Sequence, residues 1–269
     1  DRLAIVMTQT GGCCRASNYV SFIRRALDKA GYSHIPVISL NANGMEKNEG
    51  FSLSAGLVTD AAKTIVYGDL FMRCLYRVRP YEVIPGSADA LHKKWQDICI
   101  DSLINSKTQY TYKEVCRGIV NAFDSFTIDE TIRKPRVGIV GEIYVKFSPL
   151  GNNRLEEFLL SEGCEPVLPG LMDFCLYCIY NSVIDHELYG RNGKTAAVYK
   201  MVYQFVLGKQ ADIIKMMKKD GHFRPPMPFD EVRKKSHAII GQGVKMGEGW
   251  LLPAEMVELI SEGVTNIVC

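Results

Sequence analysis

The sequence predicts an α/β fold, built from Rossmann-like parallel-sheet layers with helices on both faces. The first forty residues read as strand, helix and strand, and the same order begins again near residue 136. Strands that alternate with helices form parallel sheets, because a parallel pair needs a long, right-handed crossover that is usually helical. A third observation agrees with this class, since clusters of short, closely spaced strands are few.

The first strand, helix and strand are expected at 3–8, 19–30 and 35–41. LAIVMT and IPVISLN are short apolar runs of the kind that form buried strands. Between them, apolar residues recur at helical spacing, and Gly31 provides a C-cap. Together these segments predict one βαβ unit.

Helical patterns dominate the next part of the chain. Pro80, Pro85 and Gly86 separate the first two of them. The three helical segments are expected at 57–78, 88–104 and 111–126.

The alternation of strands and helices restarts at residue 136. Strands are expected at 136–142, 165–169, 237–240 and 265–269, and helices at 154–163, 171–189, 195–219, 229–236 and 253–263. Polar loops fill 146–153 and 241–249. The restart predicts two Rossmann-like subdomains, 1–132 with a helical extension and 133–269 truncated at its C-terminus.

Composition narrows the class of protein. The net charge is +2, and the basic clusters at 133–136, 215–219 and 233–235 are short and separated, so we expect solvated faces and no nucleic-acid partner. No apolar run reaches 18 residues, which predicts no membrane span. Nine cysteines without a disulfide framework favour a reducing cytoplasm. The chain starts just before a strand and ends on an apolar run, so we expect a piece of a longer polypeptide.

Three short motifs have ordinary structural interpretations. GRNGKT (190–195) lacks the first glycine and the preceding strand of a phosphate-binding loop, and is expected to be a turn between helices. GQGVKMGEG (241–249) is one residue too long for a dinucleotide fingerprint. The two remaining interpretations are an active-site loop and a structural loop. Cys175 and Cys178 form a CxxC without a second pair, so we expect them, like the other helical cysteines, in the core.

Cys13 and Cys14 differ from the other cysteines. They follow two glycines where a strand passes into a helix, and no apolar pattern surrounds them. At this edge of an α/β sheet ligands bind, and a helix start lowers the pKa of a thiol. The pair is therefore a candidate nucleophile, redox centre or metal ligand. The alternative is a tight turn with buried thiols.

Six segments, taken in order, resemble one known family. They are TQTGGCCRASNY (8–19), PVISLN (36–41), YGDLFMRCLYRVRPYE (67–82), KPRVGIVGEIYVKF (134–147), LMDFCLYCIYN (171–181) and GEGWLLPAEMVELISEGVTNIVC (247–269). They resemble the 2-hydroxyacyl-CoA dehydratase-like part of the large activase-related proteins, a family similar to the 2-hydroxyglutaryl-CoA dehydratase subunits. The resemblance covers nearly the whole chain.

The resemblance implies a [4Fe–4S] cluster held on cysteine thiolates and a lyase of anaerobic metabolism. An ATP-dependent activase module, fused or separate, would supply one electron, which the cluster would pass to the thioester carbonyl of a 2-hydroxyacyl-CoA. The resulting ketyl radical would lose water. Cys14 matches the family's cluster ligand, whereas Cys13 stands where the family usually has glycine. Since one cysteine pair cannot complete such a cluster, we expect an incomplete ligand set and an inactive fragment.

Other site candidates follow from their positions. Gly11 and Gly12 let the backbone approach a bulky ligand. Arg15 could face a thioester oxygen or a CoA phosphate, or it could form a surface ion pair. Asn18 could bind the ligand or cap the helix. Glu142 ends a predicted strand at the ligand edge, as a general acid/base or an exposed carboxylate.

Three alternatives remain open from the sequence. The same scaffold suits an ATP-dependent low-potential reductase or a cluster-bearing electron relay for a separate dehydratase. A dinucleotide-dependent dehydrogenase is the third alternative, and it depends only on the glycines at 241–249. The acyl group of the substrate is not specified, and oligomers are compatible with each alternative.

Overall fold

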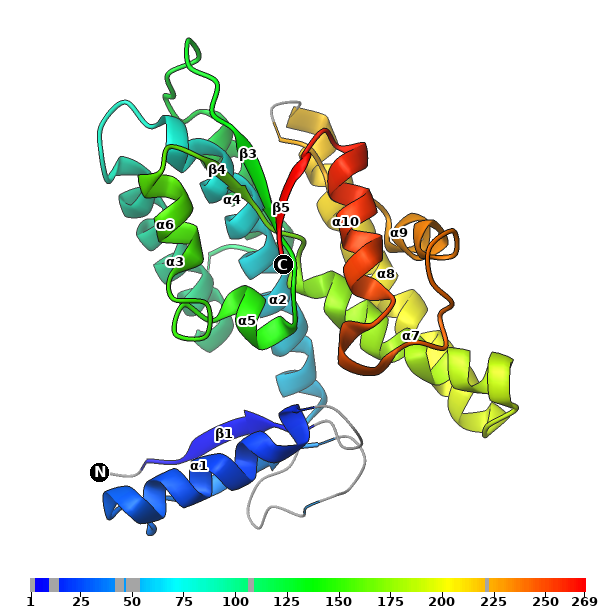
Figure 1. The fold of residues 1–269 in the computed structure, drawn as a ribbon. Helices are drawn as coiled ribbons and strands as arrows, with labels where there is room; N and C mark the ends of the chain where they lie inside the picture. Colours follow the sequence, from blue (N-terminus) through cyan, green and yellow to red (C-terminus); the bar gives the residue numbers. More distant parts are fainter. Residues whose placement is uncertain (1–2, 10–14, 42–45, 47–53, 106–108, 221–222) are drawn as a thin grey trace. The chain divides into compact units, whose positions relative to one another are not determined.

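The computed structural model describes residues 3–9, 15–41, 46, 54–105, 109–220 and 223–269 (Figure 1). The chain divides into two compact units, Asp1–Val58 and Thr59–Cys269, each considered by itself below. The α/β class is confirmed, since helices flank a two-stranded and a three-stranded sheet that are both parallel. The subdomain boundary predicted at 132 falls inside the second unit and stays a prediction.

The first unit contains the predicted βαβ arrangement. Ile5 pairs with Val37 in a parallel register. Gly31 ends the helix with a φ of 80°, and its N–H donates to the Asp28 carbonyl, as predicted for a left-handed C-cap. The elements are β1 (Ile5–Thr8), α1 (Ala16–Ala30) and β2 (Val37–Leu40).

Most of the second unit is helical. Its helices are α2 (Ala55–Val78, which begins in the first unit), α3 (Ser87–Ile104), α4 (Tyr112–Asp124), α5 (Ile143–Phe147), α6 (Leu155–Ser161), α7 (Leu171–Tyr189), α8 (Gly193–Asp220), α9 (Phe229–Ser236) and α10 (Leu251–Ser261), with 3₁₀ turns η1 (Arg79–Tyr81) and η2 (Met246–Glu248). Among the described residues, none of the helices combines the length and apolarity needed to cross a bilayer.

A three-stranded sheet of order β4-β3-β5 lies beside these helices (Figure 1). Its strands are β3 (Arg136–Ile139), β4 (Glu165–Val167) and β5 (Asn266–Val268). Val137 packs with Leu159 of α6, whereas Val140 packs with Leu259 of α10. A Cβ at Gly138 would lie 2.7 Å from Leu259 Cδ1, so glycine allows α10 its close approach. The two helices therefore cover opposite faces of the sheet.

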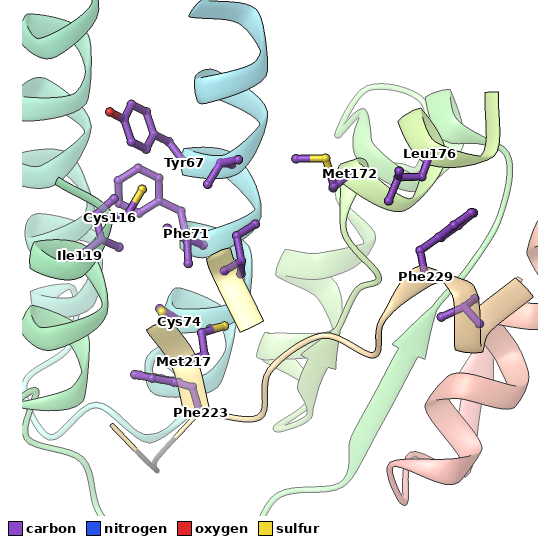
Figure 2. Close-up of a cluster of buried hydrophobic side chains, with 14 of the residues drawn as sticks. Tyr67, Phe71, Cys74, Cys116, Ile119, Met172, Leu176, Met217, Phe223 and Phe229 are labelled. Atoms are coloured by element: carbon purple, nitrogen blue, oxygen red, sulfur yellow. The ribbon is translucent and has the colours of Figure 1, made fainter. Parts of the chain in front are cut away.

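The large apolar core joins α2, α4, α7, α8 and α9 (Figure 2). Phe71, Cys74 and Ile119 come from α2 and α4, and all three are buried. Leu176 of α7 and Phe229 of α9 continue the same cluster. This core holds the elements that surround the sheet in fixed positions.

Three details of the predicted elements are wrong. The strand expected at 136–142 ends at Ile139, and α5 occupies part of the loop expected at 146–153. The apolar run 237–240 forms turns after α9 instead of a strand, and Ile239 is exposed. The turn between helices predicted at 190–195 is confirmed, since α7 ends at Tyr189 and α8 begins at Gly193.

Candidate functional site

The predicted thiol turn lies outside the described residues. Gly11, Gly12, Cys13 and Cys14 all belong to the segment 10–14. Arg15 and Asn18, which are described, are both exposed at the start of α1, where the Asn18 N–H donates to the Arg15 carbonyl (3.0 Å). Their predicted roles at a ligand stay predictions.

The described cysteines are reduced thiols in varied surroundings. Cys74, Cys99 and Cys116 are buried, which confirms their predicted place in the core. Burial raises the pKa of Cys99 and of Cys116 to about 12, so both are protonated at neutral pH. The prediction that both cysteines of the CxxC pair lie in the core is wrong for Cys178, which is exposed, whereas Cys175 is partly buried. Within the described residues, no three His, Cys, Asp or Glu side chains form a metal-binding group.

Glu142 lies just beyond the carboxyl end of β3. It is not the last residue of the strand, as predicted, but the N-cap of α5. Its Oε2 accepts hydrogen bonds from the N–H groups of Tyr144 (3.1 Å) and Val145 (3.3 Å). Its Oε1 is buried and has no hydrogen-bond partner in the described structure. A buried carboxylate oxygen without a partner is costly, which is typical of a functional position.

Glu248 reaches the same helix start from the glycine-rich segment 241–249. The Ile143 N–H donates to its carboxylate, burial raises its pKa, and the charge of Glu142 raises that pKa further. Its φ of 60° is a left-handed conformation that costs a non-glycine residue about 1–2 kcal/mol. Oε2 is buried and unpartnered among the described residues. No strand precedes this segment in the described structure, so it lacks the context of a dinucleotide fingerprint.

A buried ion pair joins α5 to α10 behind these two carboxylates. Lys146 Nζ donates to Glu255 Oε1 at 2.7 Å, and the two side chains are only 3% and 0% exposed. Burial raises the pKa of Glu255, although the nearby ammonium group opposes that change. We call Glu142, Lys146, Glu248 and Glu255 the carboxyl-edge cluster.

A second group of buried acids lies at the carboxyl end of β4, where α7 begins. Asp69 of α2 accepts the N–H groups of Leu171 (2.8 Å) and Met172 (2.9 Å), while burial raises its pKa to about 6. Burial raises the pKa of Glu258 to about 7, although the guanidinium of Arg73 opposes that shift.

Asp173, like Glu258, has one buried carboxylate oxygen without a hydrogen bond among the described residues. Its Oδ1 accepts a hydrogen bond from Gln210 (2.7 Å), but Oδ2 has no partner among the described residues. Burial and the charge of Glu258 raise its pKa well above the usual range. A cavity of about 10 Å³, close to the size of one water molecule, adjoins it. We call Asp69, Arg73, Asp173 and Glu258 the inner acidic cluster.

The carboxyl-edge cluster, and Asp69 and Asp173 of the inner acidic cluster, lie where ligands bind in open α/β sheets, outside the carboxyl ends of the strands. Asp69 and Glu258, whose pKa values burial raises to about 6 and about 7, exist both as acid and as base near neutral pH, so they can hold and return a proton. Glu142 was predicted from its place after a strand. The remaining members were missed, although a charged residue inside an apolar helical pattern, such as Glu255 in LLPAEMVELI, was an available signal.

Comparison with known proteins gives no match, neither to a family model nor to a curated protein or a solved structure.

Proposed function

We propose that this chain is part of a cytoplasmic iron–sulfur enzyme of the 2-hydroxyacyl-CoA dehydratase type. The enzyme eliminates water from a 2-hydroxyacyl-CoA thioester and works with an ATP-dependent activase module. One observation carries the proposal: four of the six segments that resemble the family contribute to the two buried charged clusters, although the contributing residues run from Asp69 to Glu258 in the sequence.

The contributions come from α2, from the β3–α5 connection, from α7 and from the segment that contains α10. A family resemblance spread over separate segments is more specific when charged residues from those segments share buried clusters, because apolar packing alone would not require charges there. The residues are Asp69 and Arg73 from 67–82, Glu142 and Lys146 from 134–147, Asp173 from 171–181, and Glu248, Glu255 and Glu258 from 247–269.

Glu142 and Glu248 are the proposed acid/base groups. Elimination of water removes a proton from carbon and protonates the departing hydroxyl, so it needs a group that gains a proton and one that gives it. Each of these carboxylates keeps one buried oxygen without a hydrogen bond in the described structure. Lys146 is a positioning residue, because its ammonium group is bound to Glu255.

The iron–sulfur cluster, when bound, would supply the single-electron chemistry that the resemblance implies. The described residues do not form a ligand set for it, since buried thiols such as Cys99 stay protonated and no metal-binding group is found among them. Cys13 and Cys14 lie outside the described residues.

The test uses the full-length polypeptide to which this chain is expected to belong. It is reconstituted anaerobically with iron and sulfide, and its iron content, EPR spectrum and turnover of a 2-hydroxyacyl-CoA with an ATP-dependent activator are measured. We expect Cys14→Ser to lose the cluster. Glu142→Gln should keep it but lose about 10²–10⁴-fold in turnover, as for a general acid/base. Glu130→Gln, at an exposed carboxylate, is the matched control.

The outcomes separate the alternatives. An unchanged cluster in the Cys13→Ser/Cys14→Ser variant would overturn the assignment of the thiol turn. Normal turnover in Glu142→Gln would overturn the acid/base role. A reducible cluster without turnover or binding of any CoA thioester would instead favour the electron relay or a reductase for another substrate.

A further inference from the structure

A larger cavity lies at the edge of the three-stranded sheet where the strands begin. Its volume is about 350 Å³, and it is lined by the C-terminal part of α2, the first residue of β3 and those before it, the length of β4 with Leu168 after it, and Phe223, Arg224 and Glu262. Because the strands are parallel, this edge is opposite to the one that carries the carboxyl-edge cluster (Figure 1). We call it the amino-edge cavity. Its charged lining residues are Arg73, Arg77, Arg133, Lys134, Arg136, Arg224, Glu165 and Glu262.

The cations in this lining outnumber the carboxylates by four, and by three when Arg73, whose charge also acts on the inner acidic cluster, is left out. Glu165, with a side chain only 7% exposed, is surrounded by the Tyr81 hydroxyl (2.7 Å), the Arg136 guanidinium (3.4 Å) and the Arg77 guanidinium (3.8 Å). Arg77 also stacks over the Tyr81 ring at 4.8 Å. One buried carboxylate therefore fixes the orientation of two guanidinium groups but can neutralise only one of them.

Two further cations, Arg133 and Arg224, are held by uncharged groups, and Arg136 has such a contact besides its ion pair with Glu165. Arg136 and Arg224 both donate to the backbone carbonyl of Glu262, and Arg133 donates to the carbonyls of Glu130 (2.7 Å) and Ile132 (2.9 Å). Carbonyl groups orient a guanidinium without cancelling its charge. Among the described residues, the cavity therefore presents guanidinium N–H donors in fixed orientations, with more positive than negative charge.

We propose that the amino-edge cavity binds a small ligand that carries a diphosphate group. Planar guanidinium forks bind phosphate oxygens in pairs, which is why arginine predominates in such sites. A phosphate monoester carries only about −1.5 to −2 at neutral pH, less than the surplus here, whereas a diphosphate brings more charge and more acceptor oxygens. The volume lies near the lower end of small-molecule sites, which suits a diphosphate group and not a folded partner.

This inference does not depend on the proposed function. The cavity uses other residues than the acid/base pair, and it requires no iron–sulfur cluster. A diphosphate group could come from a nucleoside diphosphate, from coenzyme A or from free pyrophosphate, and the experiment distinguishes these sources.

The test is isothermal titration calorimetry of this chain, without iron, against pyrophosphate, ADP, coenzyme A and inorganic phosphate. The variant Lys134→Gln/Arg224→Gln removes two cations at partly or fully exposed positions, which limits damage to the fold. Lys200→Gln/Lys234→Gln removes the same charge from exposed positions outside the cavity. Circular dichroism and thermal unfolding establish that each variant is folded.

We expect pyrophosphate to bind at least about tenfold tighter than phosphate, and the cavity variant to lose about tenfold or more per charged hydrogen bond. The control variant should change affinity less than about twofold, because screened charges at a distance contribute little. Tighter binding of ADP or of coenzyme A would support the proposal and identify the source. Absence of pyrophosphate binding, or equal losses in both variants, would overturn it.

Discussion

The buried pair of Lys146 and Glu255 provides the sharpest test of the carboxyl-edge cluster. Its two charged atoms lie 2.7 Å apart, and the side chains are 3% and 0% exposed. Glu255→Met leaves the ammonium group of Lys146 buried without its carboxylate. Removal of one partner of such a pair costs about 3–5 kcal/mol of unfolding free energy.

That cost corresponds to a measurable change in the unfolding temperature. For a domain of this size each kcal/mol shifts the midpoint by about 2–4 °C, so we expect a fall of about 6–20 °C. Both tryptophans, Trp95 and Trp250, belong to the second unit, so their fluorescence in urea or heat reports the unfolding of that unit. The single variant Lys146→Met should be destabilised to a similar extent.

Replacement of both partners should behave differently. In Lys146→Met/Glu255→Met no charge is left buried, and the side chains keep similar volumes, so stability should return to within about 1–2 kcal/mol of the wild type or exceed it. If the pair also positions the carboxyl-edge cluster, this stable double variant should still lose turnover in the reconstituted full-length polypeptide. A purely structural pair would leave turnover intact.

An exposed pair of equal length is the matched control. Lys93 and Asp97 also lie 2.7 Å apart, but their side chains are 66% and 59% exposed. Asp97→Ala should cost only about 0.3–0.5 kcal/mol, because water solvates both groups. If Glu255→Met cost no more than Asp97→Ala, or if the double variant were as unstable as the single variants, the reasoning from burial would be refuted.

Three further predictions concern stability. Burial raises the pKa of Asp69 to about 6 from its ordinary 3.8, so the folded state holds this proton more tightly than the unfolded state does. The free energy of unfolding should therefore fall by on the order of 3 kcal/mol as the pH rises from about 4 to 6. Urea titrations at several pH values should show a smaller fall for Asp69→Asn. Gly118→Ala should lower the free energy of unfolding, measured in urea, by about 1–3 kcal/mol, because the new Cβ would lie 2.0 Å from a Trp95 ring carbon. Gly208→Ala, where the added Cβ meets no atom within 4 Å, should raise it by about 0.5–1 kcal/mol. Thr111→Ala removes the capping box of α4 and should lower the thermal midpoint by an amount that corresponds to about 1 kcal/mol.

Apolar periodicity was enough to predict most elements but not their ends. The strand 136–142 was predicted three residues too long, because Val140 continues the apolar run although the sheet pairing ends at Ile139. None of the described strands pairs with the apolar run 237–240, and turns after α9 replace the predicted strand. Strand formation depends on tertiary partners that a local pattern does not contain.

The charged clusters show the same limit more strongly. Glu142 was found because its position after a strand is local information. The pairing of Lys146 with Glu255 joins positions 109 residues apart, and nothing near either residue indicates it. The apolar residues around Glu255 hint at burial, but its partner and its exposed fraction of 0% depend on the packing of α10 against the sheet and α5.

The distribution of charge along the sheet determines which chemistry each edge can perform. Helix starts at the carboxyl edge of a parallel sheet usually attract anionic ligands. Here Glu142 and Glu248 accept the first N–H groups of α5, and Asp69 accepts those of α7, so the chain's own carboxylates occupy both helix starts. A phosphate would have to displace them, whereas a neutral carbonyl or hydroxyl would not. The two proposals follow this division, with proton transfer at the carboxyl edge and diphosphate binding at the amino edge, where the surplus of cations lies.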